Sequence, residues 1–181
     1  MRIISGLLKG RNILIPGGIR PTQNKVRKAI FDILGDIAGL TFLEIFAGSG
    51  AVGFEALSKG ADRVIFIEKN HLCGETIKRN ISLLKAASCE VLSLDAQKAI
   101  LLLHKRKEYF DVIFLDPPYY QDLGKKTLQT LGAYDILAPC GFIIIQSFRK
   151  ERLPKETEKF VLVKEARYGD TVLALYNKRK A

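Results

Sequence analysis

Apolar residues gather in short runs along the chain, and seven of these runs have the length and composition of β-strands. The runs are rich in β-branched and aromatic residues and are bounded by glycine, proline or charged residues, which is typical of strands. We expect strands over residues 42–46, 64–67, 91–94, 109–115, 142–146, 160–166 and 171–176. The run over 109–115 is apolar at almost every position, so it predicts a strand that is buried on both faces of a sheet.

Segments with helical periodicity lie before and between these runs. The apolar residues of segment 26–34 fall on one helix face, with Thr22 as the expected N-cap and Gly35 as the expected end. Further helices are expected over residues 52–57, 77–84, 100–103 and 128–137. Strands and helices thus alternate with short connections through most of the chain.

This alternation predicts an α/β fold with a doubly wound, mostly parallel seven-stranded sheet. The last two runs surround the turn residues Gly169 and Asp170, so the sheet is expected to close with a C-terminal antiparallel hairpin. Two short apolar runs around Gly6 and Gly10 predict a small hairpin in front of the main fold. We therefore expect a single domain over residues 1–181, with residues 1–20 as a basic N-terminal arm or hairpin.

The charge of the chain indicates a polyanionic partner. Lysine and arginine number 29 against 19 aspartate and glutamate residues, and no acidic residue precedes Asp32. Such segregation of charge is what binding to a phosphate backbone needs, so this segment predicts contacts with nucleic acid. A merely solvated basic surface is the alternative, because no stacking aromatic residue lies among the basic residues of 2–28. The candidate RNA-binding residues are Arg2, Lys9, Arg11, Arg20, Lys25, Arg27 and Lys28, of which Arg20 alternatively serves the active site.

The cysteine and hydropathy patterns predict a cytoplasmic protein. Cys73, Cys89 and Cys140 are odd in number and contain no C-x-x-C pair, which favours buried, reduced thiols over a metal site or a disulfide. Lys9 and Arg11 interrupt the first apolar run, so we expect no secretory signal peptide. No apolar run reaches the length of a transmembrane helix, and no membrane contact is expected.

A glycine-rich turn follows the first predicted strand. Residues 48–53 have the spacing G-x-G-x-x-G between a strand and a helix, which is the spacing of a dinucleotide-binding fold. Glycines there let the backbone approach a ligand closely, and the helix N-terminus favours a negative group. Glu68 ends the next strand about 20 residues later, where an acid can accept both hydrogens of a ribose diol.

The fourth predicted strand ends at Asp116-Pro117-Pro118-Tyr119. Two successive prolines carry no backbone N–H and cannot continue a sheet ladder. The acid and the aromatic ring are therefore held on a stiff turn beyond the carboxyl end of a central strand, which is where ligands bind in open α/β sheets. A rigid turn with a capping aspartate is the structural alternative.

The order of these motifs resembles that of the S-adenosyl-L-methionine-dependent methyltransferases, in the branch that methylates exocyclic amino nitrogens of nucleobases. Residues 46–51 and 168–171, together with residues 20–22, 26–27 and 31, are similar to the bacterial 16S ribosomal RNA guanine-N2 methyltransferases of the RsmD type. The resemblance covers essentially the whole chain. It implies a monomer that uses S-adenosyl-L-methionine and acts on 16S rRNA, either free or within an assembled small-subunit particle, without a metal.

The resemblance also assigns roles to residues. The glycine loop is expected to cradle the methionyl part of the cofactor, Glu68 to hold the ribose and Asp95 to lie beside the adenine. Asp116 and the carbonyl of Pro117 are expected to accept the two hydrogens of the target amine, while Tyr119 stacks on a base swung out of its helix. The catalytic residues are then Asp116, Pro117, Pro118 and Tyr119. The cofactor-binding residues are Glu44, Phe46, Ala47, Gly48, Ser49, Gly50, Glu68, Lys69, Asp95, Ala96 and Asp116.

Other functions fit parts of the sequence. An adenine-N6 methyltransferase acting on DNA or RNA would share the Asp-Pro-Pro-Tyr motif, and an NAD-dependent oxidoreductase would share the glycine spacing alone. A non-catalytic RNA-binding module would explain the charge but leave Asp116 to Tyr119 without a purpose. A carbon-5 pyrimidine methyltransferase needs a nucleophilic cysteine, and Cys140 is expected at the opposite, amino end of the sheet.

Overall fold

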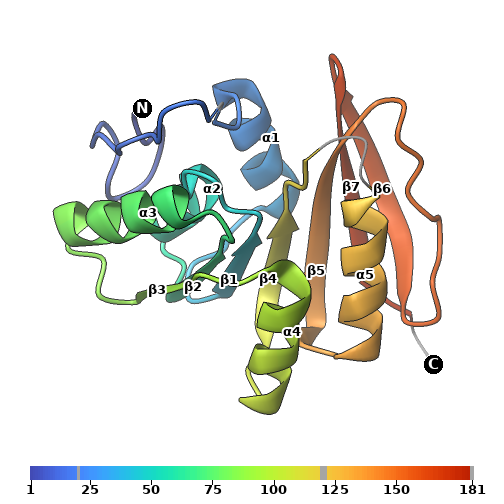
Figure 1. The fold of residues 1–181 in the computed structure, drawn as a ribbon. Helices are drawn as coiled ribbons and strands as arrows, with labels where there is room; N and C mark the ends of the chain where they lie inside the picture. Colours follow the sequence, from blue (N-terminus) through green and yellow to red (C-terminus); the bar gives the residue numbers. More distant parts are fainter. Residues whose placement is uncertain (20, 119–121, 180–181) are drawn as a thin grey trace.

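Seven strands of the described chain form one sheet, which confirms the predicted α/β class (Figure 1). The computed structural model describes residues 1–19, 21–118 and 122–179. The strands are β1 (Thr41–Ile45), β2 (Arg63–Ile67), β3 (Cys89–Leu92), β4 (Phe110–Leu115), β5 (Leu137–Phe148), β6 (Phe160–Tyr168) and β7 (Thr171–Lys178). The helices are α1 (Asn24–Leu34), α2 (Ala51–Ser58), α3 (His71–Leu84), α4 (Ala96–Lys105) and α5 (Leu123–Ala133).

The strand order is β3-β2-β1-β4-β5-β7-β6. Strands β1 to β5 run parallel, and β7 lies antiparallel between β5 and β6, as the predicted closing hairpin requires. In register, Ile45 of β1 pairs with Leu115 of β4, which pairs with Ile145 of β5. The carboxyl ends of these strands therefore lie side by side. Five elements separate β1 and β4 in sequence, and yet the two strands are neighbours, so the chain changes its direction of travel across the sheet between them.

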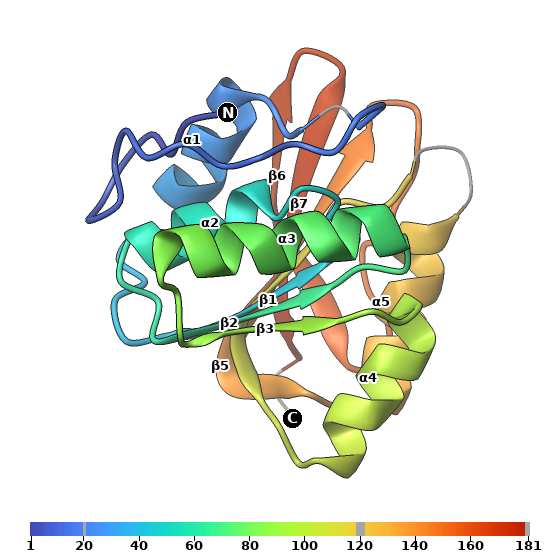
Figure 2. The same ribbon diagram turned by 60° about the vertical axis from the view of Figure 1, so that its left-hand side comes forward.

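Each face of the sheet has its own hydrophobic core. Helices α1, α2 and α3 cover one face, and α4 and α5 cover the other (Figures 1 and 2). Phe42, Phe66 and Phe114 pack in the first core, while their strand neighbours Leu43 and Ile65 pack in the second. Burial of both faces explains why the central strands are apolar at consecutive positions instead of alternating with polar residues.

The N-terminal arm (residues 1–19) packs along α2 and α3 as a loose hairpin, with an isolated antiparallel bridge between Arg2 and Asn12. The carboxylate of Glu55 on α2 accepts hydrogen bonds from the backbone N–H groups of Ile4 and Ser5, at 3.0 and 2.8 Å. The side chain of Asn80 on α3 pairs with the backbone N–H and C=O of residue 14, at 2.7 and 3.0 Å. Two polar side chains thus substitute for strand neighbours and hold the arm in place.

Arg27 is fully buried beneath this arm, so the prediction that it contacts RNA is wrong. Its guanidinium lies 3.5 Å from the Glu55 carboxylate and donates hydrogen bonds to the carbonyl of Arg2 and to Oδ1 of Asn24. Burial lowers the pKa of Arg27 below its usual value, and the charge of Glu55 opposes that shift. Periodicity cannot identify such a residue, because a partner on another helix decides whether an arginine is buried.

Two expected helix boundaries also need correction. Helix α1 begins at Asn24 after Gln23, and Thr22 is not its cap, since the Thr22 hydroxyl donates to Asp116 instead. Helix α5 ends at Ala133, so the expectation of a helix over 128–137 ran into the first residue of β5. The predicted end of α1 at Gly35 is confirmed by the left-handed backbone there, with φ of 74°.

The three cysteines are free thiols in differing environments. Cys73 is buried and Cys89 is half-buried, but Cys140 is exposed, so the expectation of burial is wrong for Cys140. Cys140 lies near the start of β5, at the amino edge of the parallel strands, as predicted. Among the described helices, none combines the length and apolar character needed to cross a bilayer.

Replacing Glu55 with alanine is expected to lower the free energy of unfolding by about 3–5 kcal/mol, because the Arg27 charge would remain buried without its partner. Glu75→Ala is the matched control, since Glu75 and Lys78 form an exposed pair at 2.8 Å. That control should change the free energy of unfolding by less than about 1 kcal/mol. Urea denaturation followed by circular dichroism measures both, and similar losses in the two variants would contradict this role of Glu55.

Candidate active site

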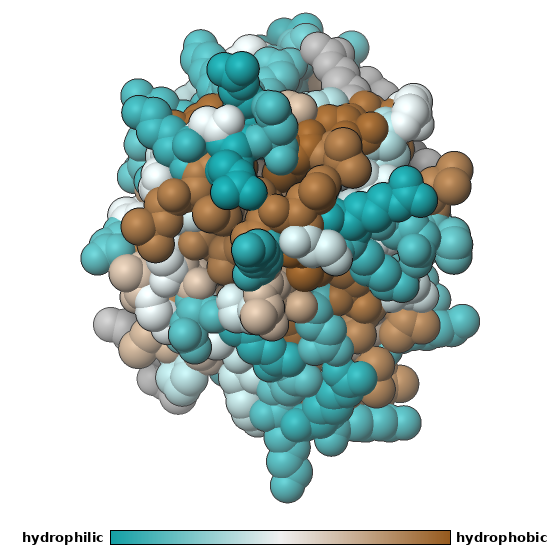
Figure 3. All heavy atoms as spheres, turned by 90° about the vertical axis from the view of Figure 1, so that its left-hand side faces the viewer, coloured by the Kyte–Doolittle hydropathy of each residue, from teal (hydrophilic) through white to brown (hydrophobic). Residues whose placement is uncertain are grey.

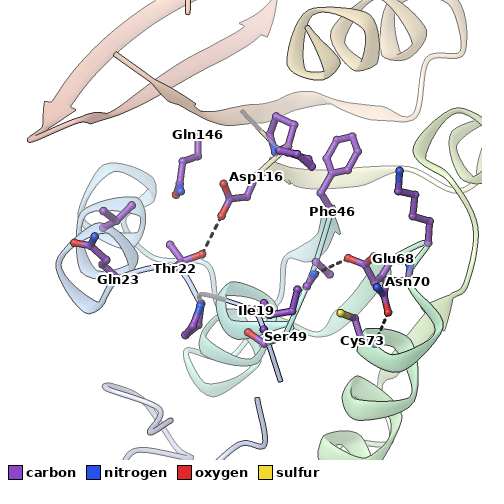
Figure 4. Close-up of a pocket in the computed structure, with 18 of the residues that line it drawn as sticks. Ile19, Thr22, Gln23, Phe46, Ser49, Glu68, Asn70, Cys73, Asp116 and Gln146 are labelled. Carbon is purple, nitrogen blue, oxygen red and sulfur yellow. Dashed lines mark hydrogen bonds between the residues drawn. The ribbon is translucent and has the colours of Figure 1, made fainter. Parts of the chain in front are cut away.

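A cavity of about 450 Å³ opens at the carboxyl edge of the sheet, within the usual size range of small-ligand sites (Figure 4). The loops after β1, β2 and β4 contribute to its wall, together with β5, the end of the arm and the start of α1. The cavity therefore lies where β1 and β4 meet and the chain changes direction. That crevice is the expected ligand site of an open α/β sheet.

The glycine loop after β1 turns sharply into α2. Phe46, Gly48 and Gly50 all have left-handed backbones, with φ of 64°, 54° and 72°. Such a conformation is costly for a residue with a side chain and persists where the surrounding structure enforces it, most often at functional sites. Phe46 and Gly48 line the cavity, so the strained turn presents its backbone to a bound ligand.

Glu44 supports this loop from beneath instead of lining the cavity. Its buried carboxylate accepts hydrogen bonds from the backbone N–H groups of Gly53, at 2.8 Å, and Val52, at 3.4 Å. Burial raises the pKa of Glu44 to about 8, and the backbone N–H donors partly offset this, while the charges of Asp116 and Glu68 raise the pKa further. The predicted cofactor residue Glu44 thus binds the first turn of α2, where free N–H groups favour an acid.

Glu68 joins the glycine loop to the end of β2. Its Oε2 accepts from the N–H of Gly48 at 2.8 Å, and its Oε1 accepts from the N–H of Asn70 at 2.7 Å (Figure 4). A carboxylate offers about four acceptor positions, so about two remain for a ligand. The side chain lines the cavity with this remaining capacity.

Asp116 lies at the inner wall of the cavity, directly after β4. Its backbone N–H donates to the carbonyl of Ile45 at 3.3 Å, and its Oδ2 accepts from the Thr22 hydroxyl at 3.1 Å. Burial raises the pKa of Asp116 to about 7, and the Thr22 hydroxyl works against that shift by stabilising the carboxylate. Near neutral pH, the side chain of Asp116 is therefore divided between the carboxylate and the protonated carboxylic acid.

The cavity collects most of the predicted site residues. Those that line it are Phe46, Ala47, Gly48, Ser49, Glu68, Lys69, Asp116, Pro117 and Pro118. Glu44, Gly50, Asp95 and Ala96 lie outside its lining. Asp95 caps α4, accepting from the N–H of Lys98 at 3.0 Å, and its place beside an adenine stays a prediction. Tyr119 and Arg20 lie outside the described residues.

The predicted site residues did not include five polar residues of the cavity lining, which are Thr22, Gln23, Asn70, Gln146 and Thr171. Thr22 has the residue type of a helix cap, so its contact with a residue 94 positions later had no local signal. Gln146 ends an apolar run and has no motif around it. A polar residue at the carboxyl end of a central strand was the one available sign of its role. No group of three or more potential metal-ligating side chains occurs among the described residues.

The fold, a mostly parallel sheet with the antiparallel strand β7 between β5 and β6, is that of the S-adenosyl-L-methionine-dependent methyltransferase class. The chain belongs to the family described as conserved hypothetical protein 95, whose model matches residues 1–177, and the predicted family resemblance is confirmed.

Curated relatives and solved structures match the chain over nearly its whole length. YlbH from Bacillus subtilis is 37% identical, over 99% of this chain and 100% of its own length. Ribosomal RNA small subunit methyltransferase D from Escherichia coli is 31% identical, over 98% of this chain and 90% of its own length. The solved structure of yhhF from Escherichia coli superimposes with a TM-score of 0.87 and 32% identity, covering 100% of this chain and 98% of that one.

Gly53→Ala is expected to destabilise the glycine loop, because a Cβ there would lie 2.4 Å from the Phe66 ring and 2.7 Å from Oε2 of Glu44. Overpacking of this kind costs about 1–3 kcal/mol. Gly132→Ala on α5 is the matched control, since its Cβ would meet its nearest neighbour at 4.0 Å. The control should gain up to about 1 kcal/mol from helix propensity. Urea denaturation compares the two variants, and a neutral Gly53→Ala would show that the loop adapts freely.

Proposed function

We propose that the protein transfers a methyl group from S-adenosyl-L-methionine to the N2 amino group of a guanine in 16S rRNA. The observation that carries this proposal is the meeting of two motifs in one cavity: the glycine loop with Glu68, and Asp116 with Pro117. The Escherichia coli relative is named a ribosomal RNA small subunit methyltransferase, which supports the substrate class. The choice of guanine N2 follows from the family resemblance.

The cavity residues suit the proposed cofactor. Glu68 keeps acceptor capacity for two ribose hydroxyls while its bonds to the backbone hold the loop still. Gly48 leaves the backbone open to a ligand, since a Cβ there would meet no atom closer than 3.7 Å, at Ile19. When bound, S-adenosyl-L-methionine supplies an electrophilic methyl group on its sulfonium.

The Asp116 end of the cavity suits the target amine. An exocyclic amine is a poor nucleophile, because its lone pair is delocalised into the base. If Asp116 and the carbonyl of Pro117 accept its two hydrogens, the nitrogen becomes pyramidal and its lone pair becomes available. Methyl transfer would form an N–C bond, break the methyl–sulfur bond so that the demethylated cofactor leaves with the electron pair, and leave one proton in excess on the nitrogen. With a pKa near 7, the Asp116 carboxylate is suited to take that proton.

Mass mapping of 16S rRNA tests the function directly. RNA from a strain that lacks the protein should carry one guanine that is lighter by one methyl group, and the purified protein should restore that methyl group in vitro with S-adenosyl-L-methionine. A restored methyl group on adenine N6 would select the alternative adenine methyltransferase. An unchanged RNA and no methyl transfer in vitro would overturn the proposal.

The activity should depend on pH through Asp116. Because only the carboxylate accepts both a hydrogen bond and a proton, kcat/KM should rise through pH about 7 and level off above it. Thr22→Val removes a donor that stabilises the carboxylate, so the midpoint should move to higher pH by about 1 unit. In Asp116→Asn the rise of kcat/KM with pH should disappear. Asp116→Ala should lose about 10²–10³ in rate with unchanged cofactor affinity. If kcat/KM of Asp116→Asn still rose through pH about 7, the rise would come from the titration of a residue other than Asp116.

The proposed RNA-binding surface consists of the arm and the exposed side of α1. Arg2, Lys9, Arg11, Lys25 and Lys28 are all exposed, whereas the buried Arg27 is withdrawn from this set. Figure 3 views the molecule from the side of the arm and shows hydrophilic side chains bordering an apolar area. The five basic side chains are therefore separate positive charges on a surface that also contains apolar residues. They favour positioning through phosphates over recognition of bases.

Charge reversal at Lys9 and Arg11 together should weaken binding of 16S rRNA and reduce its salt slope by about 1 or more, because fewer counterions are released. The matched control reverses Lys105 and Lys107, which are exposed at the end of α4, a helix on the opposite face of the sheet from α2 and α3. Cofactor affinity should stay unchanged in both variants. Filter binding over a range of salt concentrations measures the slopes, and equal slopes in all three proteins would reduce the arm to a solvated basic surface.

A further inference from the structure

Gln146 occupies a position in the cavity that no motif explains. It follows Ile145 in β5, and Ile145 pairs with Leu115, the residue before Asp116. The parallel register therefore places Gln146 and Asp116 at adjacent positions on neighbouring strands, and both side chains line the cavity. Figure 4 shows the Gln146 side chain extending into the cavity beside Asp116.

The carboxamide of Gln146 is buried without being satisfied. The residue is 6% exposed, and its Oε1 is buried without a hydrogen-bond partner in the described chain. An unsatisfied buried acceptor is destabilising and is rare in folded proteins, so each case calls for an explanation. A ligand that donates a hydrogen bond inside the cavity would provide the missing partner.

We propose that Gln146 recognises the Watson–Crick edge of the target guanine, next to the amine held by Asp116; this inference rests on the proposed function. Along that edge guanine presents a donor at N2, a donor at N1 and an acceptor at O6. Asp116 offers an acceptor, and the Gln146 carboxamide offers an acceptor at Oε1 and a donor at Nε2. The two side chains together thus complement the edge in the order that a paired cytosine would.

Other bases with an exocyclic amine fit this pair less well. In adenine, the ring nitrogen beside the amine is an acceptor, so Nε2 would bind it and Oε1 would stay unsatisfied against a C–H group. In cytosine, two acceptors follow the amine, so Oε1 would face a carbonyl oxygen. Guanine alone among the three satisfies both ends of the carboxamide. Gln146 is therefore a specificity-determining residue for the methyl acceptor.

The test replaces the target guanine with 2-aminopurine, which keeps the exocyclic amine but lacks the N1 hydrogen and the O6 oxygen. The substrate is an RNA, or a reconstituted small-subunit particle, on which the wild-type protein has been shown to methylate that guanine. For wild-type protein, kcat/KM should fall by about 10- to 100-fold on this exchange. For Gln146→Leu, the ratio between the two substrates should shrink to about 3-fold or less, because both contacts are already lost.

Gln129→Leu is the matched control, since Gln129 is exposed on α5 and lies outside the cavity. This control should keep the wild-type ratio. Gln146→Leu should also raise the melting temperature, because it removes an unsatisfied buried acceptor that serves substrate recognition. The melting temperature thus shows that Gln146→Leu is folded under the conditions in which its guanine-to-2-aminopurine ratio of kcat/KM is measured.

The outcomes separate this inference from the proposed function. A wild-type protein that methylates no guanine in 16S rRNA would overturn the proposed function. Guanine methylation with the same guanine-to-2-aminopurine ratio in wild type and Gln146→Leu would overturn the role of Gln146 and leave the function standing. A folded Gln146→Leu variant whose ratio has shrunk, with an unchanged ratio in Gln129→Leu, would support it.

Discussion

Three carboxylates gathered at the ends of adjacent strands set the main constraint on this structure. Glu44, Glu68 and Asp116 lie around one glycine loop, and the charges of Asp116 and Glu68 raise the pKa of Glu44. Backbone N–H groups stabilise two of the three, since α2 donates to Glu44 and the loop donates to Glu68. Hydrogen bonds to these two acids therefore help to hold the conformation that the glycines of the loop allow. Asp116 accepts one side-chain hydrogen bond from the described residues, from the hydroxyl of Thr22.

A second set of contacts connects the start of the chain to this site. Glu55 and Arg27 are buried together under the arm, and Arg27 also binds the carbonyl of Arg2. Helix α1 is fixed by these contacts, and the residues just before it form one wall of the cavity. Thr22 belongs to that wall. The position of the donor that tunes Asp116 thus depends on an ion pair on the other side of α1.

Sequence patterns predicted those site residues whose positions depend on a single strand and the turn that follows it. Asp116 and Glu68 were found because each ends an apolar run, and parallel strands bring such ends to one edge of the sheet. Patterns could not predict the burial of Arg27, because its partner lies on another helix. The contact of Thr22 was equally hidden, since it joins residues 94 positions apart. Gln146 became visible only through the register of β5 against β4, which no single strand encodes.

The position of β7 has a consequence for the order in which the protein is completed during synthesis. This strand pairs with β5 on one side and with β6 on the other, although it follows both of them in the described chain. Until it is in place, the outer edge of β5 carries unpaired backbone groups, and β6 has no neighbour in the sheet. Gln146 lies on that edge strand, opposite Leu173. A growing chain can therefore assemble the glycine loop and β1 to β4 early, whereas the edge of β5 that carries Gln146 is covered only when β7 has been released. The side of the cavity that the glycine loop forms is therefore made before the side that Gln146 lines is covered.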